Sequence, residues 1–443
     1  MKRPYGRFKS PPEIPWLHNW IAISNALEVS LPELQADYPS TSAASIATAI
    51  PRFPRVETVD LLRGLLMILM ALDHARDFFS GAGVNPTDPL NSWPALFATR
   101  WVTHLCAPGF VALAGTSVYL QRARGKSQSE IARLLVTRGL WLILLELTLI
   151  SFSWSLTLFA PFFQVIWAVG VAMVLLAGLQ YLPAKAVGII GAAIVILHNL
   201  LDPIQSSSLG VFANLWTLML GRGPLIFDGR PFGFVAYSAI PWTGAICLGY
   251  AFGPTVLAHQ VLARLSFWKR ALPGIALLAA FALVRIFSSY GDATRWQPLP
   301  NPTQSAMSFL NLQKYPPSLE YYLATFGVLL ILYAIFDSAA RHNWVSPLRS
   351  FIKTYGEVPF FYYVPHIWLL HIATVLVALA TGQDWHIWLQ PRVIFLSGPP
   401  PGWGFNLPFV YAIWAAVVLA LYLPCRWFSR YKSQHRYWWL SYL

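Results

Sequence analysis

The stretch LLRGLLMILMALDHARDFF, residues 61–79, is an apolar run long enough to enter a bilayer as a helix, and ionisable residues crowd its end. These residues are Asp73, His74, Arg76 and Asp77. Charged side chains are costly in the hydrocarbon region, so those found there usually pair with one another or serve a function. The stretch therefore predicts a membrane helix that delivers charged groups to a site near one face of the membrane.

The composition of the whole chain indicates a membrane protein. Of its 443 residues, 56% are hydrophobic and 11% are charged, whereas a soluble domain carries roughly 25% charged residues. The net charge is +13. In a membrane protein an excess of Lys and Arg first indicates which loops are cytoplasmic, so it is weak evidence for an acidic partner. The expected partner is the lipid bilayer and not nucleic acid. Cys106, Cys247 and Cys425 lack metal-binding spacing, and no metal is expected.

Runs of about 20 apolar residues recur along almost the whole chain and predict an all-α polytopic bundle of about ten transmembrane helices. The expected spans are residues 59–79, 97–119, 133–153, 162–181, 184–200, 234–254, 271–289, 319–338, 356–378 and 407–426. An eleventh segment, LGVFANLWTLMLG at 209–221, is too short to cross alone and is expected to be re-entrant or interfacial. Small residues such as Gly109 and Gly115 are expected helix-packing positions.

The distribution of positive charge predicts the orientation of these spans. With ten spans, 23 of the 31 Lys and Arg residues fall on the side of the two termini, which the positive-inside rule makes cytoplasmic. We therefore expect a Pro-rich cytoplasmic tail at 1–55, a transmembrane domain at 56–430 and a cytoplasmic C-terminal segment at 431–443. The longer loops, 80–96, 201–233, 290–318 and 379–406, are expected outside.

This orientation brings histidines from separate spans to one outer layer. Asp73 beside His74 is suited to set the tautomer of that histidine and raise its basicity, as general-base catalysis requires. His104 opens the second span at the same depth, and His371 lies slightly deeper in the ninth. Each of these histidines has the alternative of a packed, hydrogen-bonded core role, which we favour for His366.

Each of the other charged residues near the two membrane faces has two alternative roles. Arg76 with Asp77 is either part of the outer site or an interfacial ion pair that ends the helix. Lys314 in the loop NLQKYPPSLEYY, residues 311–322, either binds an anionic or sugar substrate or is simply solvated. On the inner side the basic segment QRARGKSQSEIARLLVTRG, residues 121–139, has enough charge to attract a nucleotide phosphate, or it only fixes topology.

Seven stretches together resemble one known family. They are RVETVDLLRGLLMILMALDHARDFF, THLCAPGFVALAGTSVYL, RGLWLILLEL, QVIWAVGVAM, IPWTGAICLGYAFG, KYPPSLEYY and YGEVPFFYYVPH. The chain resembles the heparan-alpha-glucosaminide N-acetyltransferase catalytic-domain family over residues 55 to about 430 and looks similar to its bacterial branch. The resemblance implies a multi-pass acyltransferase of the bacterial inner (plasma) membrane, which moves acetyl from cytosolic acetyl-CoA to a sugar or glycan acceptor at the outer face.

The resemblance carries over residue by residue only in part. The lysosomal branch has Asn where His74 stands and Asp where His104 stands, and its loop histidine has no counterpart in NSWPALF, residues 91–97. The base is therefore expected to be His74, oriented by Asp73, or else His104, acting directly or through an acetyl-histidine. His371 is a further candidate for catalysis. The expected donor-binding residues are Arg63, Arg122, Arg124 and Arg138, and the expected acceptor-binding residues are Asp77, Lys314 and Tyr315.

Two rival functions stay open at this point. Polar residues within spans also mark the pathways of transporters, so a proton-coupled small-molecule transporter is the main alternative. A non-catalytic membrane scaffold is the second, but it leaves the clustering of histidines unexplained. Acetylation of a glycan at the expense of acyl-CoA would separate the enzyme from both rivals. The sequence leaves a homo-oligomer open.

Overall fold

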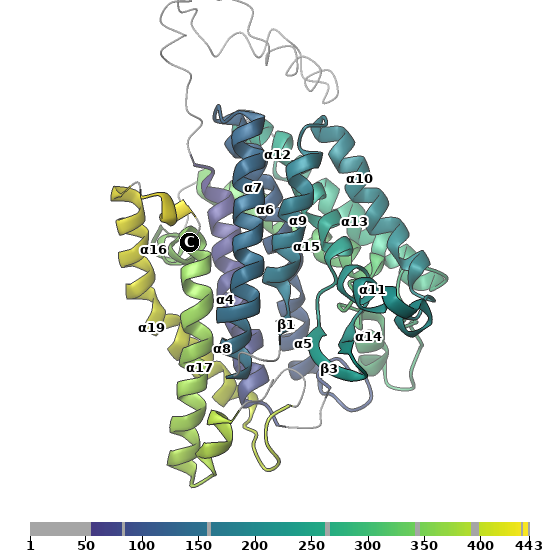
Figure 1. Cartoon of the computed structure of the whole chain (residues 1–443), viewed down its shortest axis with the longest axis vertical. Coiled ribbons are helices and arrows are strands. Elements are labelled where there is room, and N and C mark those ends of the chain that lie inside the picture. The colour runs from purple at the N-terminus through teal and green to yellow at the C-terminus, as the bar shows by residue number, and fades with distance from the viewer. Residues whose placement is uncertain are drawn as a thin grey trace, which may run out of the picture. The chain divides into compact units, whose positions relative to one another are not determined.

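Long helices that run side by side dominate the chain (Figure 1). The computed structural model describes residues 55–441 except 82–84, 157–160, 262–265, 342–345, 391–397 and 436. The tail expected at 1–55 lies outside these residues apart from its last one. Val56–Leu443 forms one unit.

The α-helices are α4 (Glu57–Phe79), α5 (Pro94–Val102), α6 (Cys106–Ala123), α7 (Gln128–Leu145), α8 (Ser151–Ser155), α9 (Val165–Leu179), α10 (Ala184–Leu197), α11 (Ala213–Met219), α12 (Ala239–Val261), α13 (Phe267–Phe287), α14 (Pro302–Leu310), α15 (Leu319–Arg341), α16 (Ser346–Glu357), α17 (Pro359–Thr381) and α19 (Leu407–Gln434). A 3-10 turn, η1 (Thr103–Leu105), joins α5 to α6, and a π-helical turn, η2 (Glu146–Ile150), joins α7 to α8.

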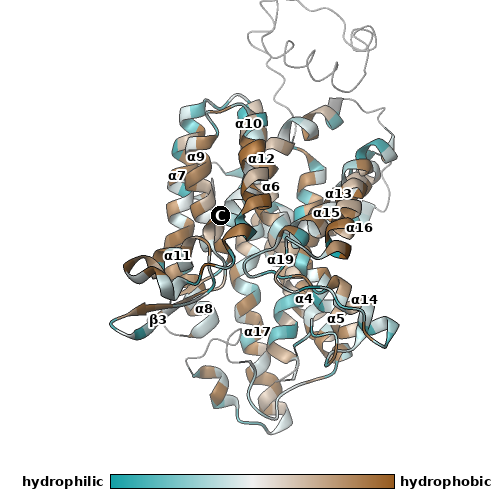
Figure 2. Ribbon diagram, turned by 90° about the vertical axis from the view of Figure 1, so that its right-hand side faces the viewer, coloured by the Kyte–Doolittle hydropathy of each residue, from teal (hydrophilic) through white to brown (hydrophobic). Residues whose placement is uncertain are grey.

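In the part of the chain that the structure describes, eight helical segments are long and apolar enough to cross a membrane. They are Pro94–Ala123, Gln128–Ser155, Ala184–Leu201, Ala239–Gln260, Phe267–Phe287, Leu319–Arg341, Pro359–Thr381 and Leu407–Gln434. The protein is therefore a multi-pass membrane protein, and hydrophobic colour covers much of these helices in Figure 2. The other two expected spans are also helices, but α4 carries several charges and α9 has only 15 residues. The count of ten spans remains a prediction.

Close backbone contacts hold the bundle together. Helix α6 packs mainly on α12, α7 on α9, α10 on α12 and α13 on α15. Gly249 of α12 lies so near the Ala112 carbonyl of α6 that a Cβ at this position would overlap it. Gly115 faces the Ile246 carbonyl in the same way, which confirms its expected packing role.

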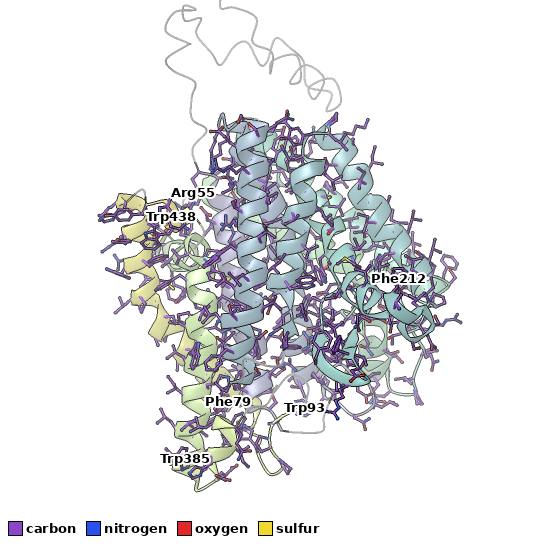
Figure 3. The ribbon with its side chains drawn as sticks, in the orientation of Figure 1. Arg55, Phe79, Trp93, Phe212, Trp385 and Trp438 are labelled. Carbon is purple, nitrogen blue, oxygen red and sulfur yellow. The ribbon has the colours of Figure 1, made fainter. Side chains whose placement is uncertain are left out.

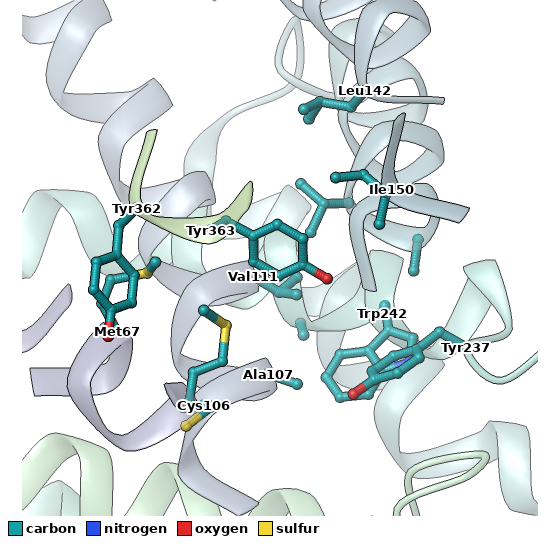
Figure 4. Packing of buried hydrophobic residues seen from close by; sticks show 14 of the residues in the cluster. Met67, Cys106, Ala107, Val111, Leu142, Ile150, Tyr237, Trp242, Tyr362 and Tyr363 are labelled. Carbon is teal, nitrogen blue, oxygen red and sulfur yellow. The ribbon is translucent and has the colours of Figure 1, made fainter. Parts of the chain in front are cut away.

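The hydrophobic core lies along the inner faces of these helices. Figure 4 shows Tyr362 and Tyr363 of α17, Cys106 of α6 and Trp242 of α12, which belong to one buried cluster that also includes Met67 of α4. Many aromatic side chains in this cluster carry a polar atom at one end, so the core can hold hydrogen bonds as well as apolar contacts.

The protein is mostly helical, but it also contains a small β-sheet. Strands β2 (Gly223–Phe227) and β3 (Arg230–Val235) form an antiparallel hairpin, and β1 (Phe162–Phe163) pairs with β3 in parallel. The turn residues Asp228 and Gly229 both have positive φ, as the favoured two-residue hairpin turn requires. Residues 209–221, the expected interfacial segment, form the end of a 3-10 helix and then α11.

The ends of the helices separate into two groups. Phe79 at the end of α4 and Trp93 before α5 lie toward the same end of the bundle as Trp385, while Trp438 lies toward the other end (Figure 3). Residues from two of the loops expected on the outer side, 80–96 and 379–406, therefore lie toward the end of the bundle where α4 ends. That end holds the candidate site.

Candidate functional site

A buried carboxylate, Asp73, is the centre of the charged end of α4. Its Oδ1 accepts hydrogen bonds from Arg76 at 2.8 Å and from the Thr103 hydroxyl at 2.8 Å. Arg100 of α5 lies 3.5 Å from the same oxygen and also donates to Thr103. Since Asp73 is only 9% exposed, these partners offset the cost of burying its charge.

Lys314 approaches Asp73 from a distant part of the sequence. Its Nζ lies 3.9 Å from Asp73 Oδ2 and 5.2 Å from the centre of the Tyr315 ring. The lysine is 6% exposed, so it is part of this buried cluster and not a solvated loop residue. Asp77 completes the cluster by accepting a 2.6 Å hydrogen bond from Arg76.

The charges of this outer cluster do not cancel. Three cations, Arg76, Arg100 and Lys314, face two carboxylates, Asp73 and Asp77. The cluster therefore carries one net positive charge when all five groups are ionised. A ligand with an acidic group or several hydroxyls is suited to such a site.

Aromatic side chains form the wall next to this cluster. The hydroxyls of Tyr315 and Tyr237 lie 3.5 Å apart, and their rings meet edge to face at 5.1 Å. Arg222 also lies over the Tyr315 ring, with its guanidinium carbon 5.4 Å from the ring centre. Burial raises the pKa of Tyr237, in the loop before α12, well above its usual range, so its hydroxyl stays protonated and can donate.

His104 borders the same wall. Its ring meets Tyr321 edge to face at 5.4 Å, and the Tyr321 hydroxyl donates to the His104 carbonyl at 2.7 Å. The histidine is 2% exposed, and its Nδ1 has no hydrogen-bond partner among the described residues. His104 is thus held by its backbone, while its ring keeps hydrogen-bonding capacity.

His74 pairs with a histidine and not with Asp73, which differs from the expected Asp73–His74 pair. Its Nδ1 lies 2.7 Å from Nε2 of His366 in α17, and the two rings stack with centres 5.0 Å apart. The reason is geometric, because neighbouring residues on a helix point about 100° apart. Asp73 faces α5, whereas His74 faces α17.

The hydrogen bonds of this pair determine where the protons sit. Nδ1 of the fully buried His366 lies 3.2 Å from the Tyr362 carbonyl, which can only accept, so this nitrogen carries a hydrogen. In the neutral ring, Nε2 of His366 is then an acceptor, and the hydrogen between the two rings belongs to His74 Nδ1. His74 Nε2 is therefore left with an unprotonated lone pair, as a general base requires.

His371 lies five residues after His366 in α17, on the far side of an aromatic layer. Its Nε2 donates to the Ser153 carbonyl at 2.8 Å, and its ring meets Phe78 edge to face at 4.8 Å. Phe78 in turn contacts Trp154, which packs against His74. The structure thus places His371 near His74 but outside the Asp73 cluster.

Two of the four candidate donor-binding arginines tie helices together. Arg63 of α4 donates to Asp60 at 3.0 Å and to Ser117 of α6 at 2.8 Å. Arg122 donates to the Gln180 carbonyl at 3.1 Å and to the Tyr250 hydroxyl at 3.0 Å. Ser117 and Arg122 are close in sequence, so these contacts gather near one end of α6.

The other two arginines are on neighbouring segments. Arg124 is the C-cap residue of α6, and Arg138 is a half-buried residue of α7. Arg63, Arg122 and Arg124 therefore lie toward the ends of α4 and α6 that are remote from the outer cluster, whereas Arg138 lies near the middle of α7. Their role in binding a donor remains a prediction.

Sequence reasoning missed several residues of the outer cluster. Arg100 and Thr103 precede His104 within the same expected span, so they could have been predicted as site residues from their closeness to His104. Tyr237 and Tyr321 carried no such signal, because only the tertiary fold brings them to the cluster. Within the described ranges, no group of three or more His, Cys, Asp or Glu residues is placed to hold a metal ion.

The arrangement is that of a multi-pass membrane protein with an ionisable site between its helices. A family model described as "Heparan-alpha-glucosaminide N-acetyltransferase, catalytic" matches residues 55–284, which is more than half of the chain. The protein belongs to this family, which implies a membrane-bound acetyltransferase. The match contains Asp73, His74 and His104, whereas Lys314 and His366 lie beyond it. A search of curated proteins found no match.

Proposed function

We propose that this protein moves an acetyl or other acyl group from cytosolic acyl-CoA to a sugar or glycan acceptor at the outer face of a bacterial plasma membrane. The observation that carries the proposal is the 2.7 Å hydrogen bond between His74 Nδ1 and His366 Nε2, from which we infer an unprotonated Nε2 on His74. Family membership supports the acetyltransferase class. The acceptor class rests on the charged and aromatic outer cluster.

The proposed topology has ten spans, with α4 and α9 crossing the membrane in addition to the eight long apolar segments. Both termini are then cytoplasmic, as are the tail at 1–55 and the segment at 431–443. Residues 56–430 form the transmembrane acyltransferase domain in this proposal. The excess of Lys and Arg on the side of the termini supports this orientation.

The donor reaches the site from the cytoplasmic side. Arg63, Arg122, Arg124 and Arg138 attract the phosphates of CoA, and the pantetheine arm threads between α4 and α6 toward the outer cluster. Such a path lets the thioester meet an acceptor that never enters the cytoplasm. The position of Arg63, hydrogen-bonded between α4 and α6, supports this path.

The acceptor binds at the outer cluster, where Asp77, Lys314 and Tyr315 contact it. Asp73 acts as a positioning residue that holds Arg100 and Lys314 beside the acceptor. The net positive charge of the cluster favours an acceptor that carries an acidic group near the reacting amine or hydroxyl.

In the transfer step, His74 Nε2 removes a proton from the acceptor amine or hydroxyl as that group attacks the thioester carbonyl. The carbon–sulfur bond breaks, and the imidazolium proton passes to the departing CoA thiolate. The same lone pair also allows a route through an acetyl-histidine, in which His74 attacks first. His104 is the second candidate base, because its ring lies at the aromatic wall. His371 supports the aromatic layer behind His74.

The test is acyl-CoA consumption by the full-length protein in nanodiscs. Release of the CoA thiol is measured with acetyl-CoA and a glucosamine-terminated oligosaccharide, and the acetylated product is identified by mass spectrometry. We expect His74→Gln to lower kcat by about 10²- to 10⁴-fold. His386→Gln, an exposed loop histidine, is the matched control and should not change it. Wild type that releases no thiol in nanodiscs but takes up a solute with protons in sealed proteoliposomes would replace the proposal with the transporter.

A further inference from the structure

Arg222 lies between α11 and β2, beside the aromatic wall of the outer cluster. Its backbone is fixed on both sides. The Gly221 N–H donates to the Trp216 carbonyl at 3.0 Å and so closes the end of α11. Gly223 begins β2 and pairs with Val235 of β3. The Arg222 side chain therefore starts from a defined point at the base of the β2–β3 hairpin.

Two aromatic rings hold the guanidinium of Arg222. Its carbon lies 5.4 Å from the centre of the Tyr315 ring, in the loop before α15, and 5.7 Å from the centre of the Phe234 ring, on β3. The negative face of an aromatic ring attracts such a cation. A side chain that is held in place before a ligand arrives loses less entropy when the ligand binds. Arg222 is therefore better prepared to bind than a freely moving surface arginine.

No carboxylate of the described residues neutralises this cation. Arg222 is exposed, and within the described ranges its guanidinium contacts the two rings without an ion pair or a hydrogen bond. A ring attracts the charge but leaves the N–H donors available. Arg76 and Arg100 differ, because both lie against Asp73. Arg222 thus presents an open set of donors to a ligand.

One ring connects Arg222 to the outer cluster. Lys314 Nζ lies 5.2 Å from the centre of the same Tyr315 ring and 3.9 Å from Asp73 Oδ2. Lys314 is buried, whereas Arg222 is exposed. Tyr315 therefore lies between an inner cation that is already paired and an outer cation that is not. A ligand that reacts at the outer cluster and also reaches Arg222 must extend past Tyr315.

We propose that Arg222 binds an anionic group, carboxylate or phosphate, on the sugar next to the one that is acylated, and so determines which acceptor is used. The planar guanidinium matches the oxygens of either group with two parallel hydrogen bonds. This inference rests on the proposed function, because it takes the outer cluster as the acceptor site. It also gives the β2–β3 hairpin a role, since the hairpin brings both Arg222 and Phe234 to Tyr315.

The experiment compares three disaccharides that differ in one group. In each, glucosamine is linked to glucuronic acid, to a phosphorylated glucose or to unmodified glucose. Calorimetry with full-length protein in nanodiscs measures the Kd of each without acyl-CoA, and thiol release with acetyl-CoA measures kcat and KM. We expect the wild type to bind one or both acidic disaccharides about tenfold more tightly than the neutral one.

Arg222→Gln should remove this preference by raising the Kd and KM of the acidic disaccharides about tenfold and those of the neutral one much less. Arg222→Lys keeps the charge but not the planar fork, so it should recover only part of the preference. Arg230→Gln is the matched control, because Arg230 is exposed on the same hairpin. It should leave the preference unchanged.

Equal loss of preference in Arg222→Gln and Arg230→Gln would overturn the inference, because it would indicate only the general surface charge. An equal rise in the Kd of all three disaccharides in Arg222→Gln would also overturn it and indicate a packing role. A preference that is present in a maltoside detergent but absent in phosphatidylcholine nanodiscs would assign Arg222 to the phosphates of lipid headgroups instead.

The two measurements separate this inference from the proposed function. A binding preference that depends on Arg222, without release of thiol, would support the anion site and contradict acyl transfer. Thiol release with all three disaccharides at similar KM would support acyl transfer and contradict the anion site.

Discussion

His74 and His366 share one hydrogen bond of 2.7 Å, although they are 292 positions apart in the chain. Since the Tyr362 carbonyl fixes a hydrogen on the far nitrogen of His366, the shared hydrogen belongs to His74. A residue in α17 thereby determines which nitrogen of an α4 histidine is available to a substrate. His366 is a positioning residue in this arrangement.

Replacing His366 therefore tests how the base is held. His366→Phe removes the acceptor for His74 Nδ1–H, so both tautomers of His74 become accessible and we expect kcat to fall by about 10²-fold or more. His366→Gln offers a side-chain oxygen as acceptor and should recover part of this loss. The KM for acetyl-CoA should stay within threefold in both variants. Steady-state thiol release measures both quantities, and equal loss in the two variants would contradict the positioning role.

Removing the charge of Asp73 should destabilise the protein. Asp73→Asn leaves Arg100 and Lys314 buried without their carboxylate, and breaking a buried ion pair in this way costs about 3–5 kcal/mol. The free energy of unfolding in detergent, or the melting temperature, measures the effect. The double variant Asp73→Asn with Lys314→Gln removes one unpaired charge and should recover part of the stability. Additive losses would show that the two residues do not interact.

Arg285 holds the loop after α13 in place, a structural role that could not be inferred from its position within an expected span. Its guanidinium, buried in α13, pairs with Glu320 at 2.8 Å and donates to the carbonyls of Phe309, Thr294, Ser308 and Asn311. Arg285→Met leaves Glu320 without its partner, so we expect a loss of about 3–5 kcal/mol in unfolding free energy. Arg295→Met, at an exposed loop position, is the control and should change stability little.

The orientation of the spans can be tested by cysteine labelling. The three native cysteines are buried, so they should react slowly with a maleimide that does not cross membranes. Ala293→Cys, in the exposed loop before α14, should be labelled on intact cells. Lys126→Cys, between α6 and α7, should be labelled only after the membrane is opened. The reverse pattern would invert the proposed topology.

The helices were predictable because apolar runs of membrane length are a strong local signal, and every expected span contains a helix. The bounds were less accurate, since the expected spans at 162–181 and 234–254 begin in strands β1 and β3. Helix α16 was missed because its 12 residues are amphipathic and too polar to resemble a span. The β2–β3 hairpin was missed although its Asp228-Gly229 turn is a recognisable signal.

The candidate site was predictable only where single residues were unusual for their surroundings. Asp73, His74 and His104 were noticed as ionisable groups in apolar helices. Their partners could not be inferred, since the pairing of His74 with His366 and of Asp73 with Lys314 depends on how distant helices rotate and pack. Arg285 shows the converse, because a charged residue inside a span turned out to anchor a loop.

The π-helical turn at Glu146–Ile150 determines the direction in which the residues after it in the same helix point. One residue inserted into an α-helix turns the next segment by about 100°. The Ser153 carbonyl that receives His371 and the Trp154 ring that packs on His74 both come after this turn. If the same sequence formed a regular α-helix without this wide turn, both groups would point about 100° away from their histidines, so the π turn is as specific to the site as the side chains themselves.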